Sequence, residues 1–160
     1  MKKFISASLF ALLLLMQNSY AAVSQAPDID LPGVNGSVSL AQFKGKVVYL
    51  DFWASWCKPC KNSFPWLHSL KENFAAQGFE VVAINLDKDR ALADAFLKVM
   101  DVNFTVAFDE SGDTASRYKL KGMPSSYLIG RDGKLYASHI GFREKDKAKL
   151  EQGIKQLLSK

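Results

Sequence analysis

Cys57 and Cys60 are the only cysteines among the 160 residues of the chain, and they stand three positions apart in the stretch LDFWASWCKPCKNSFP, residues 50–65. A pair at this spacing can close a small disulfide, supply half of a metal site, or work as a redox couple. Closing so small a loop restricts the unfolded chain little, so a bridge with only a structural purpose would stabilise the fold weakly. The two cysteines are therefore candidates for a functional role rather than a purely structural one.

A metal site at these thiols would need two further ligands at suitable spacing. The only histidines, His68 and His139, lie far apart in the sequence. His68 falls in the segment after the cysteines and is expected on the surface, whereas His139 lies in an expected strand and is predicted to be structural. We therefore predict no bound metal and no organic cofactor. A copper-binding or purely structural module remains the non-enzymatic alternative, which predicts no turnover of protein disulfides.

The segments around the cysteines favour redox chemistry. Residues 46–54, KVVYLDFWA, form a near-continuous apolar run of the length expected for a strand that is buried on both faces. Residues 58–77 carry apolar side chains at helical spacing and are predicted to form a helix. Cys57 would then stand at the N-terminal end of this helix, where free N–H groups and the helix dipole stabilise an anion.

This position gives the two thiols different tasks. The pKa of Cys57 is expected to fall below the free value of about 8.5, and the positive charge of Lys58 adds to the effect. Pro59 suits the first helical turn, where its missing N–H costs nothing. Cys60, one step around the helix, is expected to be better buried. The sequence thus predicts Cys57 as the attacking nucleophile and Cys60 as the resolving thiol, which releases the mixed disulfide.

The rest of the chain predicts one α/β domain over residues 22–160, with a mixed sheet and helices on both faces. Residues 27–45 predict a hairpin with an Asn35-Gly36 turn, and residues 89–100 predict an amphipathic helix. The apolar face of this helix is expected to hold Leu92, Phe96 and Val99. Further strands are predicted at 79–86, 104–109, 125–130 and 134–142, with a turn at Arg131-Asp132-Gly133 and further helices at 111–120 and around 150–158.

Residues 1–21 are predicted to be a cleaved signal peptide. Two lysines precede an apolar run over residues 4–16, and small side chains suit cleavage after Ala21. This run is shorter than the roughly 20 residues that span a bilayer, so stable membrane insertion is not expected. Removal of the two lysines lowers the net charge of +5 by two. With no basic stripe in an exported chain, nucleic-acid binding has little support.

The stretch VVYLDFWASWCKPCK, followed by Pro65 and by GMPSSYLIGRDGKL with Pro124, resembles the thioredoxin superfamily. The preceding segment APDIDLPGVNGSVSLAQFKGKVV and the extra αβ unit resemble the exported TlpA/ResA-like branch, and the resemblance covers essentially the whole mature chain. It implies a thioredoxin-like fold with an N-terminal β-hairpin extension and an inserted αβ unit. Peroxiredoxins share the fold, but their attacking cysteine follows a P-x-x-x-T-x-x-C pattern, and ASWC lacks the threonine.

The resemblance also implies roles for single residues. Trp56 would flank the nucleophile, Pro124 would be a cis-proline that faces the disulfide, and Met123 would offer its backbone to an extended substrate segment. Asp51 matches the buried acid of ordinary thioredoxins. A carboxyl buried near the resolving thiol has a raised pKa and can accept the Cys60 proton. The alternative is a strand-end Asp51 that pairs with a lysine or faces water.

Ser63 stands where the cytochrome-maturation members of the branch usually carry a glutamate, which favours a general thiol reductase over that specialist. We therefore predict a periplasmic, monomeric thiol–disulfide oxidoreductase that reduces protein disulfides and is recharged by a membrane electron donor of the DsbD type. A disulfide oxidant and a cytochrome c maturation thioredoxin remain the enzymatic alternatives, because the Lys-Pro pair between the cysteines is not diagnostic of redox direction.

Overall fold

A computed structural model describes residues 24–160, so the predicted signal peptide and its cleavage after Ala21 lie outside the described residues. The apolar runs form a seven-stranded sheet in the order β2-β1-β5-β4-β3-β6-β7. Strand β4 pairs in parallel with both β3 and β5. The other pairs, β1–β2, β1–β5, β3–β6 and β6–β7, are antiparallel. The strands are β1 Asp30–Gly33, β2 Gly36–Ser39, β3 Val47–Trp53, β4 Phe79–Asn85, β5 Thr105–Phe108, β6 Ser125–Ile129 and β7 Leu135–Ile140.

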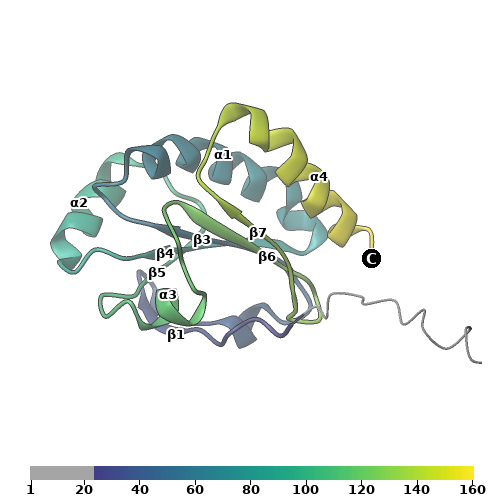
Figure 1. The fold of residues 1–160 in the computed structure, drawn as a ribbon, viewed down its shortest axis with the longest axis horizontal. Coiled ribbons are helices and arrows are strands. Elements are labelled where there is room, and N and C mark those ends of the chain that lie inside the picture. Colours follow the sequence, from purple (N-terminus) through teal and green to yellow (C-terminus); the bar gives the residue numbers. More distant parts are fainter. Residues whose placement is uncertain (1–23) are drawn as a thin grey trace, which may run out of the picture.

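Helices cover both faces of this mixed sheet, as predicted. Helices α1, α2 and α4 lie on one side, and α3 lies on the other (Figure 1). No helix within residues 24–160 is both long enough and apolar enough to cross a membrane. The helices are α1 Lys58–Phe74, α2 Arg90–Val99, α3 Asp113–Arg117 and α4 Lys147–Leu158, with short 3-10 helices η1 Leu40–Phe43, η2 Ala75–Gln77 and η3 Glu144–Asp146.

Two local predictions differ from the structure, the hairpin turn by one position and the end of the first helix by three. In the first hairpin Gly33 pairs with Gly36, so the turn is Val34-Asn35 rather than Asn35-Gly36. Gly36 has a φ of 108° and begins β2, because its positive φ lets the chain return directly into the strand. The segment predicted as one helix over residues 58–77 ends at Phe74 and continues as η2.

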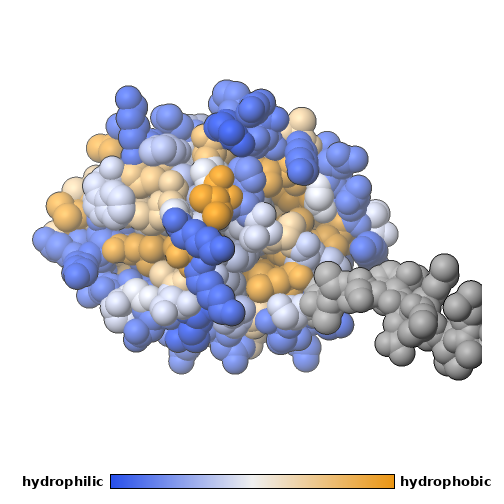
Figure 2. Space-filling view, viewed as in Figure 1, coloured by the Kyte–Doolittle hydropathy of each residue, from blue (hydrophilic) through white to orange (hydrophobic). Residues whose placement is uncertain are grey.

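The predicted apolar face of α2 is also wrong. Of its three residues only Phe96 is buried, while Leu92 and Val99 are exposed. The second buried position of α2 is Ala93, which fits because the Trp53 ring already lies 4.8 Å from that of Phe96. On the face shown in Figure 2, apolar patches lie among hydrophilic side chains.

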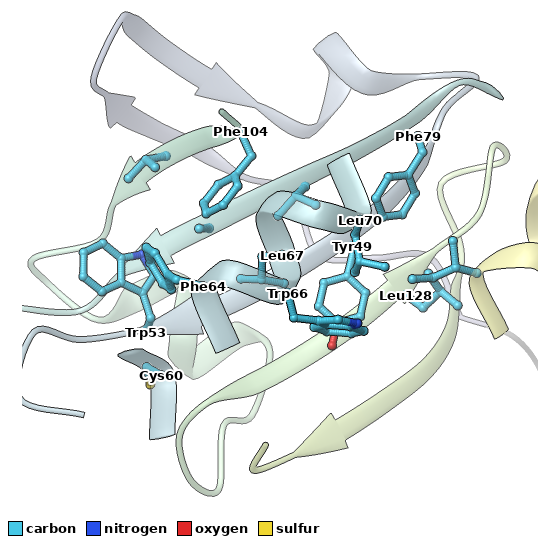
Figure 3. Close-up of a cluster of buried hydrophobic side chains, with 14 of the residues drawn as sticks. Tyr49, Trp53, Cys60, Phe64, Trp66, Leu67, Leu70, Phe79, Phe104 and Leu128 are labelled. Carbon is cyan, nitrogen blue, oxygen red and sulfur yellow. The ribbon is translucent and has the colours of Figure 1, made fainter. Parts of the chain in front are cut away.

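Strand β3 lies at the centre of the core, with all seven of its residues buried. Its side chains alternate between the two faces, so that Tyr49 and Trp53 point toward α1. The Trp53 ring packs edge-on against Phe64 of α1 at 5.0 Å, and Tyr49 packs against Trp66 at 5.6 Å (Figure 3). These contacts fix the start of α1, and with it the cysteine pair, over the end of β3.

Candidate active site

The two cysteines form a disulfide at the start of α1, with their Cα atoms 5.3 Å apart. Cys57 is the N-cap residue, and its sulfur accepts a hydrogen bond from the backbone N–H of Cys60 at 3.3 Å. Pro59 lies in the first turn, as predicted. The sulfur of Cys57 thus lies at the positive end of a 17-residue helix, which stabilises a thiolate there once the disulfide is reduced.

The two sulfurs face different surroundings. Both cysteines are buried among the core side chains, with 6% of Cys57 and 0% of Cys60 exposed, and of the two Cys57 lines an open groove of about 560 Å³. Trp56 lies at the groove with 68% of its surface exposed. Besides these two, the groove is lined by Lys58, Pro59, Leu86, Ala115, Leu120, Gly122 and Met123. The two cysteines therefore differ mainly in their access to the groove.

The wall of the groove opposite Cys57 comes from the chain that leads into β6. Phe52 pairs with Ser125 in antiparallel register, so the residues before Ser125 lie beside the loop that carries the cysteines. Met123 lines the groove, Pro124 is buried behind it, and the peptide bond between them is cis. The cis bond before Pro124 agrees with the resemblance.

Asp51 is buried in the middle of the sheet, with 2% of its surface exposed. Its side chain follows the alternation of β3 and lies on the face that α1 covers, between Tyr49 and Trp53. The Oδ2 atom has no hydrogen-bond partner among residues 24–160, and burial raises the pKa of the carboxyl well above its usual range. The alternative of an Asp51 that pairs with lysine or faces water is therefore excluded.

Sequence reasoning missed a second buried acid, Asp87, just beyond the end of β4. Its carboxylate accepts hydrogen bonds from the backbone N–H and the hydroxyl of Ser55, both at 2.8 Å, and from the Asn85 amide at 2.7 Å. Ser55 is the residue before Trp56, so Asp87 fixes the loop that presents Trp56 and Cys57. An acid after a buried parallel strand was the available signal, but its partner on the neighbouring loop is not visible in the sequence.

The remaining predicted positions lie away from the groove. Ser63 is buried in α1, where its hydroxyl donates to the Cys60 carbonyl at 2.8 Å. His68, also in α1, is half-buried with its Nδ1 3.6 Å from the Glu72 carboxylate. His139 lies on β7. Within residues 24–160 no three His, Cys, Asp or Glu side chains are grouped so that they could hold a metal ion.

The sequence and structure are similar to those of known proteins. The sequence profile of the AhpC/TSA family matches residues 23–138. The thiol-disulfide oxidoreductase ResA of Bacillus thuringiensis subsp. konkukian (strain 97-27) is 34% identical over 134 residues, which cover 83% of this chain and 76% of the relative.

Two crystal structures extend this similarity. One, assigned to a thiol:disulfide interchange protein DsbE from Chlorobium tepidum, superposes with a TM-score of 0.83 and 51% identity over 84% of this chain and 96% of the other. The other is the exposed lipoprotein thioredoxin Etrx1 of Streptococcus pneumoniae strain TIGR4, with a TM-score of 0.72 and 32% identity over 82% of this chain and 100% of the other.

Proposed function

The chain belongs to the AhpC/TSA family and is a thiol–disulfide oxidoreductase, and we propose that it reduces disulfide bonds of other proteins outside the cytoplasm. The predicted thioredoxin-like fold and the ResA-like resemblance are confirmed by the relatives. The observation that supports the proposed mechanism most directly is the unequal placement of the two sulfurs. Cys57 borders an open groove at a helix N-terminus, and Cys60 lies enclosed behind it.

The reaction begins with both cysteines reduced. The Cys57 thiolate attacks one sulfur of a substrate disulfide, which forms a mixed disulfide and releases the other substrate sulfur as a thiol after it takes a proton from water. Cys60 then gives its proton to the Asp51 carboxylate and attacks the sulfur of Cys57. The Cys57–Cys60 disulfide forms, and the second substrate sulfur leaves. Two electrons thus pass from the two cysteines to the substrate, which becomes a dithiol.

The groove suits an extended protein segment around a cysteine. Its apolar lining can contact the side chains next to that cysteine, and the backbone of Met123 can pair with the segment as an added strand. Trp56 provides a large exposed apolar surface beside the nucleophile. Lysines are exposed on the segments that line the groove, which favours substrates with acidic residues near the disulfide. These lysines are Lys58, Lys88, Lys119 and Lys121.

The charges at the site favour the oxidising direction only weakly. The helix N-terminus and Lys58 stabilise a thiolate, which stabilises the reduced form and favours an oxidant. Lys58 is exposed, so water and salt weaken its effect. Asp51 adds little opposing charge, because burial raises the pKa of its carboxyl well above its usual range. The resemblance to thioredoxins supports the reducing direction, which we propose.

A reductase outside the cytoplasm needs a source of electrons, and a membrane donor of the DsbD type fits the compartment that the predicted signal peptide implies. The similarity to a lipoprotein thioredoxin named as exposed supports this location. We propose a monomer with no nucleic-acid partner.

The cysteine roles are tested by the reduction of insulin with dithiothreitol as electron donor. Cys57→Ser should lower turnover by at least about a thousandfold, because the attacking thiolate is lost. Cys60→Ser should still attack but stall, so that a mixed disulfide with insulin accumulates and is detected by mass spectrometry. Asn62→Ser, an exposed change in the same helix, serves as control and should keep full turnover. If the mixed disulfide accumulates in the Cys57→Ser variant instead, Cys60 is the attacking thiol and Cys57 the resolving one.

A further inference from the structure

A row of polar side chains crosses three adjacent strands on the face that α1 and α4 cover. Asp51 of β3 pairs directly with Ser126 of β6, and Ser126 pairs directly with His139 of β7. Directly opposite residues of neighbouring strands point to the same face, with Cβ atoms about 4.5–5.5 Å apart. The row therefore leads from the buried carboxyl of Asp51 to the edge of the sheet.

Unpaired hydrogen-bonding atoms lie at both ends of this row. Among the described residues, three buried side-chain nitrogen or oxygen atoms have no hydrogen-bond partner, and two of them are Asp51 Oδ2 and His139 Nε2. Ser126 lies between them and is bonded to the Tyr49 hydroxyl at 2.8 Å. Buried polar groups without partners are rare in folded proteins. His139 Nε2 lies 3.5 Å from an oxygen of Asp146, so the atom of the row that needs an explanation is Asp51 Oδ2.

A cavity connects the middle of the row to the surface. It has a volume of about 500 Å³ and lies between α4 and the β6–β7 pair, with Tyr49, Ser126 and His139 among its lining residues. This volume is far larger than one water molecule needs, and the hydroxyl groups of Tyr49 and Ser126 offer hydrogen bonds to water. Part of the His139 side chain, 24%, is exposed.

We propose that Asp51 exchanges its proton with solvent through Ser126 and the adjoining cavity, with His139 as the proton shuttle at the sheet edge. This inference rests on the proposed role of Asp51 as acceptor of the Cys60 proton. Before Cys60 reacts, the protonated Asp51 passes its proton to the hydroxyl of Ser126, which passes its own proton on to water in the cavity. His139 takes up a proton there and releases it to bulk water, so no electrons move and the Asp51 carboxylate is available to accept the Cys60 proton in the resolving step.

The surroundings of His139 suit this task. Histidine is the side chain that ordinarily gains and loses a proton between pH 5 and 8. The Nε2 atom of His139 lies 3.5 Å from the Asp146 carboxylate, within ion-pair distance. Hydrogen bonding by Arg143 lowers the pKa of Asp146, so this carboxylate stays charged. Lys149 of α4 and Tyr49 of β3 are the other titratable groups that line the cavity.

The test uses the reduced protein and the aromatic disulfide dithiobis(nitrobenzoate), which releases one coloured thiol when Cys57 attacks and a second when Cys60 resolves. His139→Ala should leave the first phase unchanged and slow the second roughly tenfold. Added imidazole should restore the second phase, because a free imidazole in the cavity replaces the missing shuttle. His139→Gln, which keeps a polar side chain of similar size, should be equally slow.

His68 provides a matched control, since the chain has only these two histidines. Its side chain is 27% exposed and lies 3.6 Å from a carboxylate, against 24% and 3.5 Å for His139. His68→Ala should leave both phases unchanged, with or without imidazole. A second phase that is unaffected by His139→Ala, or that is slowed without rescue by imidazole, would overturn the shuttle.

Asp51→Asn separates this inference from the function on which it rests. The variant should slow the second phase, and neither His139→Ala nor imidazole should change the rate further. If Asp51→Asn leaves the second phase unchanged, the proposed role of Asp51 fails. If Asp51→Asn slows the phase but His139→Ala does not, Asp51 keeps its role and only the path through His139 fails.

Discussion

Asp51 and Asp87 are two aspartates with the same exposure, 2% each, and opposite surroundings. Asp87 accepts three hydrogen bonds of 2.7–2.8 Å and holds the loop before Cys57. Asp51 lies beneath α1, where Oδ2 has no partner among the described residues. Burial of a carboxylate is costly unless hydrogen bonds compensate for lost water. The compensated acid, Asp87, thus has the properties of a structural group, and the surroundings of the uncompensated one, Asp51, fit the proton-transfer role proposed for it.

The largest effect on stability is expected at Asp87, the acid whose burial is compensated by hydrogen bonds. Asp87→Ala leaves the Ser55 N–H and the Asn85 amide without their acceptor, and we expect a loss of about 3 kcal/mol in the free energy of unfolding. For a chain of this size, that loss lowers the thermal midpoint by roughly 6–12 °C. Thermal unfolding at neutral pH measures the effect, with the exposed Asp101→Ala as control. An unchanged midpoint would mean that the hydrogen bonds of Asp87 do not stabilise the fold.

At Asp51, the acid without compensating hydrogen bonds, we expect a substitution to raise the stability of the fold rather than lower it. The pKa of Asp51 is raised in the folded state, so its contribution to stability is fully present below the unfolded value and is lost as pH rises through the raised value. Each pKa unit corresponds to about 1.4 kcal/mol. Asp51→Asn does not titrate, so its thermal midpoint should exceed that of the unchanged protein by several degrees at high pH and by little at pH 4.

Thermal unfolding of both proteins over a pH series measures this difference. Asp87→Asn is the matched control, because it makes the same change at an acid of equal burial, and it should lower the midpoint at neutral pH. A midpoint for Asp51→Asn below that of the unchanged protein across the series would contradict the account of Asp51.

The smallest effect is expected at Ser55, which reaches Asp87 through two bonds. Ser55→Ala removes the hydroxyl bond but keeps the backbone bond. We expect a loss of about 1 kcal/mol, which corresponds to roughly 2–4 °C in the thermal midpoint. The exposed Ser69→Ala is the control in the same assay. A loss as large as that of Asp87→Ala would mean that the hydroxyl bond, rather than the backbone bond, holds the loop.

The sequence predicted those features that depend on local pattern. The apolar run before Cys57 identified β3, and the position of Cys57 before a helical segment identified the N-cap. Contacts between distant segments could not be predicted, because they depend on register. The pairing of Ser126 with His139 and the bond from Ser55 to Asp87 are of this kind. The apolar face of α2 was misjudged because packing, rather than spacing, selected Ala93.

The reduction potential of the Cys57–Cys60 couple tests the proposed reductase most directly. Equilibration of the protein with graded dithiol buffers, followed by counting of free thiols, gives this value. We predict a potential near that of thioredoxin, about −270 mV, which requires a donor to keep the pair reduced. A potential near that of the oxidant DsbA, about −120 mV, would contradict the reducing direction.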